Sequence, residues 1–262
     1  MRETETNRGV WEERTAIHLA SSWYDVEGFR RNRCTLRSVE LEEVGDVAGK
    51  RLLHLQCHFG LDTLSWARRG AKVTGADFSH EAIAFARRLA DELHLDAEFV
   101  CSDIYDLPDN LAGVFDIVLT TYGVLAWLPD LTRWGEVIAQ FLDDGGAFYI
   151  VEKHPLFRTL VEEDGKLVAA KPYFDVGPIV VRSERTYAAP EATLTNDTYY
   201  QWQHSLSDVV NALTGTGLHI EFLHELPFSL WRLPTMVPTE DGWWRLPDRD
   251  LPLMFSLRAR KR

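Results

Sequence analysis

The segment RLLHLQCHFGLDTLSWARRGAKVTGADFS, residues 51–79, contains the pattern that decides the fold. It begins with an apolar run at Arg51–Gln56, which predicts a strand. A helix is expected to follow from Asp62 and to end at Gly70, because basic residues followed by glycine are typical of a helix C-terminus. Lys72–Ala76 then predicts a second strand. The segment therefore indicates two strands joined by a helical crossover.

The same alternation continues through the rest of the chain. Apolar residues recur at helical spacing in Ser79–Leu93, Leu131–Leu142 and Ser205–Leu213. The first and third of these predicted helices begin at an N-cap serine. Further apolar runs predict strands at Ala97–Cys101, Phe115–Thr120, Ala147–Val151, Leu218–Leu223 and Leu253–Ala259. Strands that alternate with helices form right-handed crossovers in nearly all proteins. The chain is thus predicted to be an α/β protein with a doubly wound, mostly parallel sheet.

Three stretches do not fit this alternation. Residues 1–48 precede the first strand, and we expect a helical cap in which Val10–Phe29 covers the ligand site as a lid. Residues 155–203 are expected to form a small antiparallel insertion. Within it, Val161–Lys166 is interpreted as a helix end and a turn, while Ile179–Thr186 and Leu194–Trp202 predict two strands. The Trp- and Pro-rich segment Leu226–Asp250 is predicted to be a long loop.

Composition narrows the class of protein. The chain has 262 residues, which suits one enlarged domain or two small ones, and its net charge of −12 disfavours nucleic-acid binding. Its three cysteines are widely spaced, so no disulfide framework is expected. The charged N-terminus does not resemble a signal peptide, and the apolar runs are too short to span a bilayer. We therefore expect a cytoplasmic protein with a small-molecule substrate and with neither a nucleic-acid nor a membrane partner.

Candidate ligand-binding residues follow the predicted strands. In an open α/β sheet, ligands bind beyond the carboxyl ends of the strands. Gly60 allows a tight turn before a helix N-terminus, which favours negative charge. Asp77 can accept hydrogen bonds from two ribose hydroxyls, and Asp103 can accept one from an adenine amine, with Phe78 and Ile104 on either side of the ring. Together these residues predict an adenosine site.

These residues resemble the core of the class I S-adenosylmethionine-dependent methyltransferases over residues 49–153. Residues 51–79 stand in the place of the family's first two motifs, CSDIYDL (101–107) resembles its aspartate after the third strand, and FDIVLTTYGVLAWLPDLTRW (115–134) with LDDGGAFYIVEKHP (142–155) resembles its fourth motif and fifth strand. The resemblance implies a Rossmann-like, seven-stranded sheet with an antiparallel last strand slotted between strands five and six. It also makes residues 49–262 the methyltransferase domain and S-adenosylmethionine the cofactor.

The first motif departs from the family pattern of an acidic residue followed by three glycines at every second position. His54 stands in place of the acid, Gln56 and His58 stand in place of two glycines, and only Gly60 remains. A carbonyl from Gln56 and a carboxylate from Asp62 are the candidates to hold the methionine amino group. The residues expected to bind the cofactor are Gln56, His58, Gly60, Asp62, Thr63, Asp77, Phe78, Ser79, Asp103, Ile104, Thr121 and Tyr122.

Catalytic residues are less well defined by the sequence. His154 and His18 are the candidate general bases, with Tyr24 and His204 as further options, because histidine titrates near neutral pH. Tyr122, Trp127, Trp231, Trp243 and Trp244 are candidates for an apolar substrate pocket or for the hydrophobic core. His54, Cys57 and His58 lack a fourth ligand nearby, so no metal site is expected.

The sequence favours a methyltransferase that acts on a small organic molecule by in-line displacement. Two alternatives stay open. A nicotinamide dehydrogenase is one, because Asp77 lies at the spacing of a ribose-binding acid, although the GxGxxG pattern is missing. The other is a non-catalytic protein of the same fold that binds the cofactor without turnover.

Overall fold

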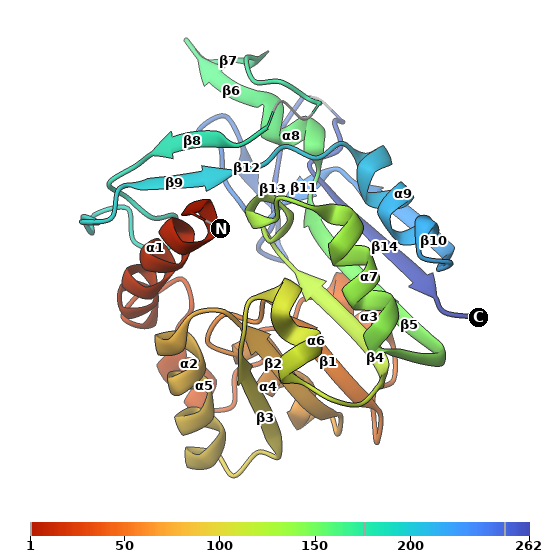
Figure 1. Cartoon of the computed structure of the whole chain (residues 1–262). Coiled ribbons are helices and arrows are strands. Elements are labelled where there is room, and N and C mark those ends of the chain that lie inside the picture. Colours follow the sequence, from red (N-terminus) through yellow and green to blue (C-terminus); the bar gives the residue numbers. More distant parts are fainter. Residues whose placement is uncertain (1, 175–176, 249) are drawn as a thin grey trace.

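A seven-stranded sheet forms the centre of the computed structural model, which describes residues 2–174, 177–248 and 250–262 (Figure 1). Its strands are β1 Arg51–Leu55, β2 Lys72–Asp77, β3 Ala97–Cys101, β4 Phe115–Thr121, β5 Leu142–Lys153, β10 His219–Leu226 and β14 Met254–Arg260. They follow the order β10-β14-β5-β4-β1-β2-β3. The pairs among β1 to β5 are parallel, whereas β14 is antiparallel to both β5 and β10. The predicted sheet, including the place of its last strand, is confirmed.

Helices cover both faces of this sheet (Figure 1). They are α4 Leu61–Arg68, α5 His80–Glu92, α6 Leu107–Asn110, α7 Leu131–Phe141 and α9 Leu206–Gly215, with the short 3-10 turns η1 Ile104–Asp106 and η2 Leu125–Trp127. Neighbouring strand residues point to opposite faces. Leu53 of β1 accordingly packs in one buried cluster with Trp134 of α7, and Leu52 packs in another with Trp66 of α4. Burial of both faces explains why the strands are apolar without alternation.

Three helices precede the sheet, namely α1 Arg2–Leu19, α2 Val26–Arg30 and α3 Ser38–Val44. The side chain of Asn7 on α1 makes two 2.8 Å hydrogen bonds with the main chain of Tyr200. The Glu13 carboxylate accepts from the main-chain N–H groups of Thr195 and Asn196. The first helix is therefore joined to the segment that follows the sheet's fifth strand.

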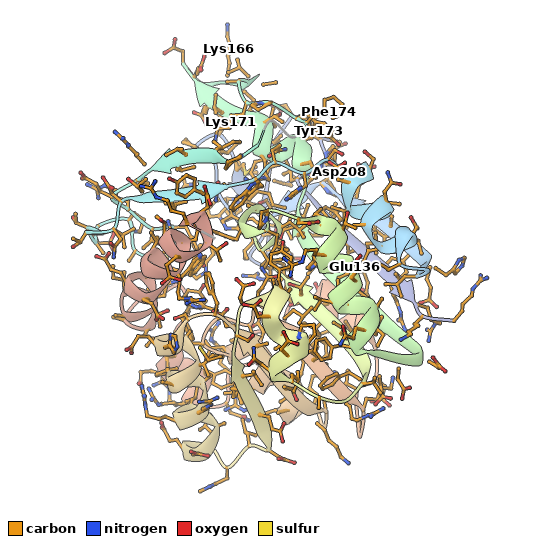
Figure 2. All side chains as sticks on the ribbon, viewed as in Figure 1. Glu136, Lys166, Lys171, Tyr173, Phe174 and Asp208 are labelled. Carbon is orange, nitrogen blue, oxygen red and sulfur yellow. The ribbon has the colours of Figure 1, made fainter. Side chains whose placement is uncertain are left out.

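The segment from residue 155 to 203 consists of helix α8 Pro155–Thr159 and two antiparallel pairs, β6 Leu160–Glu163 with β7 Lys166–Ala169 and β8 Ile179–Arg182 with β9 Thr198–Gln201. Residues 175–176 of the expected insertion lie outside the described residues. The helix end expected at Val161–Lys166 is wrong. Asp164 and Gly165 both have positive φ, at 49° and 74°, as a two-residue hairpin turn requires. Figure 2 shows Lys166 at the outer end of this hairpin.

The two strands expected at Ile179–Thr186 and Leu194–Trp202 exist but are shorter than predicted. The loop expected at Leu226–Asp250 is also corrected, although its residue 249 lies outside the described part. It contains the two-residue strands β11 Phe228–Ser229, β12 Val237–Pro238 and β13 Trp244–Arg245, which form a small antiparallel sheet. Two residues are too few to give a detectable alternation in sequence. Among the described helices, none has the length and apolar character needed to cross a membrane.

Candidate cofactor site and active site

A cleft with a volume of about 220 Å³ opens at the carboxyl ends of β1, β2, β3 and β4. The turns after these four strands supply most of its wall, and the N-terminal segment closes it with Trp11, Tyr24, Arg33 and Arg37. The structure brings together most of the predicted cofactor residues here, namely Gln56, His58, Gly60, Asp62, Asp77, Phe78, Asp103, Ile104, Thr121 and Tyr122.

Two predicted cofactor residues do not line the cleft. Thr63 is fully buried, and its hydroxyl lies 2.8 Å from Nδ1 of His54. Ser79 is also fully buried, where its hydroxyl caps α5 by accepting from the Ala82 N–H and donates to Glu12. Both hydroxyls are therefore engaged within the protein, and we correct their assignment from ligand binding to support of neighbouring residues.

The turn after β1 has a left-handed backbone at three positions, and only one of them is a glycine. Gln56 and His58 have φ values of 55° and 52°, and Gly60 has 80°. Non-glycine residues pay a steric cost in this left-handed region, and such residues cluster at functional sites. A side chain at Gly60 would displace its neighbours, because a Cβ there would lie 2.7 Å from the Phe99 ring. The turn therefore directs two polar side chains into a cleft that glycines would have left open.

The Asp77 carboxylate can accept hydrogen bonds from hydroxyl groups in the cleft. It ends β2, and its two oxygens accept hydrogen bonds from the main-chain N–H groups of His58 at 2.9 Å and Ser79 at 3.0 Å. A carboxylate offers about four lone-pair sites, so one site remains on each oxygen for a ligand. Burial raises the pKa of Asp77 to about 6, although the two N–H groups oppose this shift. The group is thus ionised and able to accept at neutral pH.

Asp103 occupies the equivalent place after β3. One oxygen accepts from the Tyr105 N–H at 2.9 Å, which fixes the carboxylate at the start of η1. Burial raises the pKa of Asp103 above its ordinary value. Phe78 and Ile104 line the cleft beside it. The remaining lone pairs and the two apolar side chains suit a flat, nitrogen-bearing ring.

A neutral amide, a carboxyl group and two guanidinium groups line the cleft near β1. The Gln56 side-chain oxygen is buried and has no hydrogen-bond partner among the described residues, and its amide nitrogen lies 3.5 Å from the Val124 carbonyl. Asp62 accepts a short hydrogen bond from the Thr35 hydroxyl. Burial raises the pKa of Asp62, and the positive charges of Arg37 and Arg33 partly oppose the shift. An acceptor pair beside two guanidinium groups suits a zwitterionic amino-acid group.

Residues 52–146 match a family model that is described as a methyltransferase domain. The ubiquinone biosynthesis O-methyltransferase of Xanthomonas oryzae pv. oryzae is 33% identical over 135 residues, which make up 50% of this chain and 56% of that protein. The match thus spans little more than half of that relative's length. Residues 52–146 therefore resemble a methyltransferase domain. The family's cofactor is S-adenosylmethionine, and the fit of the strand-end residues to adenosine and to an amino-acid group agrees with it.

Two solved structures share the fold of the methyltransferase domain and its flanking segments. An S-adenosylmethionine-dependent methyltransferase from Mesorhizobium loti has a TM-score of 0.61 at 20% identity and covers 86% of this chain and 98% of its own. A second one, from Methanosarcina mazei, has a TM-score of 0.57 at 18% identity, with 86% and 98% covered.

His54 on β1 is a neutral structural group beside the cleft. Its ring nitrogens lie 2.8 Å from the Thr63 hydroxyl and 3.3 Å from the Thr121 hydroxyl. Burial lowers the pKa of His54 to about 3. The side chain therefore contributes no charge to the cleft.

His18 does not line the cleft, contrary to its expected role as a general base. It is fully buried, with Nδ1 3.1 Å from Nε2 of His58 and Nε2 2.6 Å from the Thr186 hydroxyl. Burial and the nearby Arg14 lower the pKa of His18 to about 3. Both nitrogens are occupied and the ring resists protonation, so His18 connects the N-terminal helix to the β1 turn and the insertion.

His154 also lies outside the cleft. It is the N-cap of α8, where Nδ1 accepts from the Leu156 N–H at 3.0 Å and Nε2 lies 2.9 Å from the Glu225 carboxylate on β10. Its position after β5 turns it toward the β10 side of the sheet, so the expectation of a catalytic base is corrected. His204 has Nε2 2.7 Å from the Leu128 carbonyl and is likewise absent from the cleft wall.

Aromatic side chains line the part of the cleft beyond the strand ends. Of the candidates from the sequence, Tyr122, Trp127 and Trp231 line it, whereas Trp243 is buried and Trp244 packs elsewhere. The N-terminal segment and the insertion add Trp11, Trp23, Tyr24 and Tyr187, which sequence reasoning did not assign to a pocket. Burial raises the pKa of Tyr24, which makes it a poor base at neutral pH. No local motif marks these residues, because they come from separate segments.

Proposed function

We propose that this protein transfers the methyl group of S-adenosylmethionine to an oxygen of a small, planar organic molecule. The observation that carries the proposal is the order of ligand-binding groups along the sheet edge. Asp103 follows β3, Asp77 ends β2, and Gln56 and Asp62 follow β1. Because these strands are neighbours in that order, about 5 Å apart, the groups match adenine, ribose and methionine in sequence.

The methionine part of S-adenosylmethionine would be held by groups other than the acidic residue and glycines of the family's first motif. The unpartnered Gln56 oxygen and the Asp62 carboxylate would accept from the ammonium group, and the Arg37 guanidinium would face the carboxylate. Charge-assisted hydrogen bonds of this kind are the strong ones. A bound cofactor supplies an electrophilic methyl group on a positively charged sulfur, so the protein's task is mainly to align the acceptor with it.

The acceptor would lie over β4 and the aromatic wall formed by Trp11, Trp127, Trp231 and Tyr187. Aromatic surfaces of this kind favour a planar, largely apolar molecule. An oxygen acceptor is supported by the curated relatives that are named O-methyltransferases. The net charge of −12 disfavours a nucleic-acid substrate.

Calorimetric titration of the protein with S-adenosylmethionine, S-adenosylhomocysteine and NAD tests the proposal. We expect binding of the first two and none of NAD, because the Gln56 and His58 side chains occupy the turn that a pyrophosphate would approach. Binding of NAD alone would instead favour a dehydrogenase. Cofactor binding without any methyl transfer to hydroxylated aromatic compounds would favour a non-catalytic role.

A further inference from the structure

Tyr122 links the cleft to the buried carboxyl group of Glu40. Tyr122 follows β4 and lines the cleft, and its hydroxyl donates a very short hydrogen bond to Oε2 of Glu40 on α3. Glu40 is 1% exposed, and its other oxygen accepts from the Arg37 N–H at 2.8 Å. Tyr122 also has a φ of 58°, a left-handed value that is uncommon outside glycine. The local structure therefore fixes a phenol between the cleft and a buried acid.

The place of Tyr122 in the sheet puts it on the acceptor side of the cleft. The groups suited to adenine, ribose and methionine follow β3, β2 and β1, and β4 is the next strand along the edge. A ligand that extends from β3 to β1 thus presents its far end to the turn after β4. The candidate bases His18, His154 and His204 do not line this cleft. His54 and His58 do line it, and burial lowers the pKa of both rings.

A second Tyr–Glu pair on the same helix provides a comparison. Glu43, three residues after Glu40, accepts from the Tyr149 hydroxyl at 2.8 Å. Tyr149 is 1% exposed and does not line the cleft, and Glu43 also contacts Ser256 and His224. Both pairs combine a tyrosine hydroxyl with a glutamate of α3, but of the two tyrosines only Tyr122 lines the cleft and can contact a ligand there.

Glu40 is able to change its protonation state near neutral pH. Burial raises the pKa of Glu40 to about 7, with hydrogen bonds from Tyr122 and Arg37 opposing the shift. The titratable and charged groups that face it are Tyr122 after β4, Tyr149 on β5, Asp62 on α4 and Arg37 before α3. Asp62 raises the pKa further through its negative charge. A carboxylate of this kind is matched to general-base chemistry at pH 7.

We propose that Tyr122 and Glu40 form a relay that removes the hydroxyl proton of the methyl acceptor, a role that rests on the proposed function. The acceptor oxygen forms a bond to the methyl carbon while the methyl–sulfur bond breaks and its electron pair stays on sulfur. The acceptor proton passes to the Tyr122 oxygen as the phenolic proton of Tyr122 passes to Glu40. The products are an ether, a neutral thioether, an unchanged tyrosine and a protonated Glu40, which then loses its proton to solvent.

Glu40→Gln is the variant that separates the relay from a structural role. An amide keeps both hydrogen bonds, because its oxygen can accept from the Arg37 N–H and its nitrogen can donate to the Tyr122 oxygen, yet it takes up no proton. Glu43→Gln is the matched control on the same helix. Tyr122→Phe tests the other member of the relay. Binding of S-adenosylhomocysteine by each variant reports whether fold and cofactor site are intact.

The assay measures S-adenosylhomocysteine formed from S-adenosylmethionine with catechol and 3,4-dihydroxybenzoate as probe acceptors, at pH 5 to 9. In the wild type and in Glu43→Gln, kcat/KM should fall below about pH 7, because Glu40 must be ionised to take the proton. In Glu40→Gln and Tyr122→Phe we expect a loss of roughly 100- to 10,000-fold. The inflection near pH 7 should also vanish, so that the remaining rate rises with hydroxide without a plateau.

An infrared titration of the protein without ligand measures the carboxyl group directly. The component of the protonated-carboxyl band that disappears near pH 7 should be present in the wild type and in Glu43→Gln and missing in Glu40→Gln. A component that disappears near pH 6, from Asp77, should be common to all three proteins. Failure of the wild type to bind S-adenosylhomocysteine would contradict the proposed function and the relay with it. Cofactor binding combined with no transfer to either probe would contradict the proposed methyl transfer and the relay with it. Methyl transfer with a pH profile that Glu40→Gln leaves unchanged would overturn the relay alone.

Discussion

Glu12 on α1 accepts a 2.7 Å hydrogen bond from the hydroxyl of Ser79, the residue that caps α5. The same carboxylate accepts from the main-chain N–H groups of His80 and Glu81 at 2.8 and 3.0 Å. Negative charge is favourable at a helix N-terminus. Because Asp77 lies two residues before Ser79, the N-terminal helix directly holds the turn that carries the proposed ribose ligand.

This link leads to a prediction for the N-terminal segment, which we propose acts as a lid. Binding of S-adenosylhomocysteine should slow hydrogen exchange in residues 10–29, since Trp11 and Tyr24 line the cleft and gating segments open more easily than the core. Exchange in α9, which lies away from the cleft, is the internal control. Equal protection of residues 10–29 with and without ligand would show that α1 is a fixed flank of the sheet.

Replacing Asp77 should weaken cofactor binding. Asp77→Ala removes a carboxylate whose free lone pairs face the cleft, so we expect a loss of about 1.5–3 kcal/mol in binding S-adenosylhomocysteine, the range for hydrogen bonds to charged groups. Calorimetric titration measures the change. Asp91→Ala, an exposed substitution on α5, should bind like the wild type. Unchanged affinity in Asp77→Ala would remove Asp77 from the site.

Gln56 and Asp62 should affect only ligands that carry an amino-acid group. Gln56→Ala and Asp62→Asn are each expected to lower the affinity for S-adenosylhomocysteine about tenfold, or by about 1.4 kcal/mol. Affinity for 5′-methylthioadenosine, which lacks the amino-acid group, should stay within twofold of the wild type. Asp77→Ala is the comparison variant, because it should lower the affinity for both ligands. Equal losses for both ligands in the Gln56 and Asp62 variants would argue against our assignment.

Gly60→Ala should destabilise the fold through two separable effects. The residue has a φ of 80°, and an added Cβ would lie 2.7 Å from the Phe99 ring. Gly165→Ala shares the positive φ of 74° but meets nothing within 4 Å, so it reports the backbone strain alone. We expect about 1 kcal/mol for Gly165→Ala and roughly 2–4 kcal/mol for Gly60→Ala, measured by urea unfolding. Similar values for the two variants would mean that the Phe99 ring moves aside freely.

Glu40 should make the folded protein less stable as the pH rises. Its folded pKa of about 7 lies above the ordinary value of 4.5, so between these values the folded state binds a proton that the unfolded state has lost. Stability therefore falls with rising pH in this window, by up to about 1.4 kcal/mol per pH unit. Urea unfolding from pH 4.5 to 8 should show a shallower decline in Glu40→Gln than in Glu43→Gln. Parallel curves would indicate that Glu40 titrates at its ordinary pKa.

The sequence predicted the sheet and most of the residues that line the cleft at its edge. Both depend on local patterns, since apolar runs and helical spacing define the strands and helices, and parallel strands bring their carboxyl ends to one edge. Asp77 and Asp103 could be placed at this edge because each lies at the carboxyl end of a strand. The Asp164–Gly165 dipeptide is also a local signal, because Asp-Gly is typical of a two-residue hairpin turn.

The chemistry beyond the strand ends was decided by tertiary structure. His18 and His154 were reasonable bases by residue type, but their ring nitrogens are occupied by partners that no sequence pattern identifies. Glu40 and Tyr122 are 82 residues apart and meet only because α3 packs beside the end of β4. Local sequence sets backbone conformation, whereas the burial that moves a pKa and the pairing of distant side chains arise only once the chain has packed.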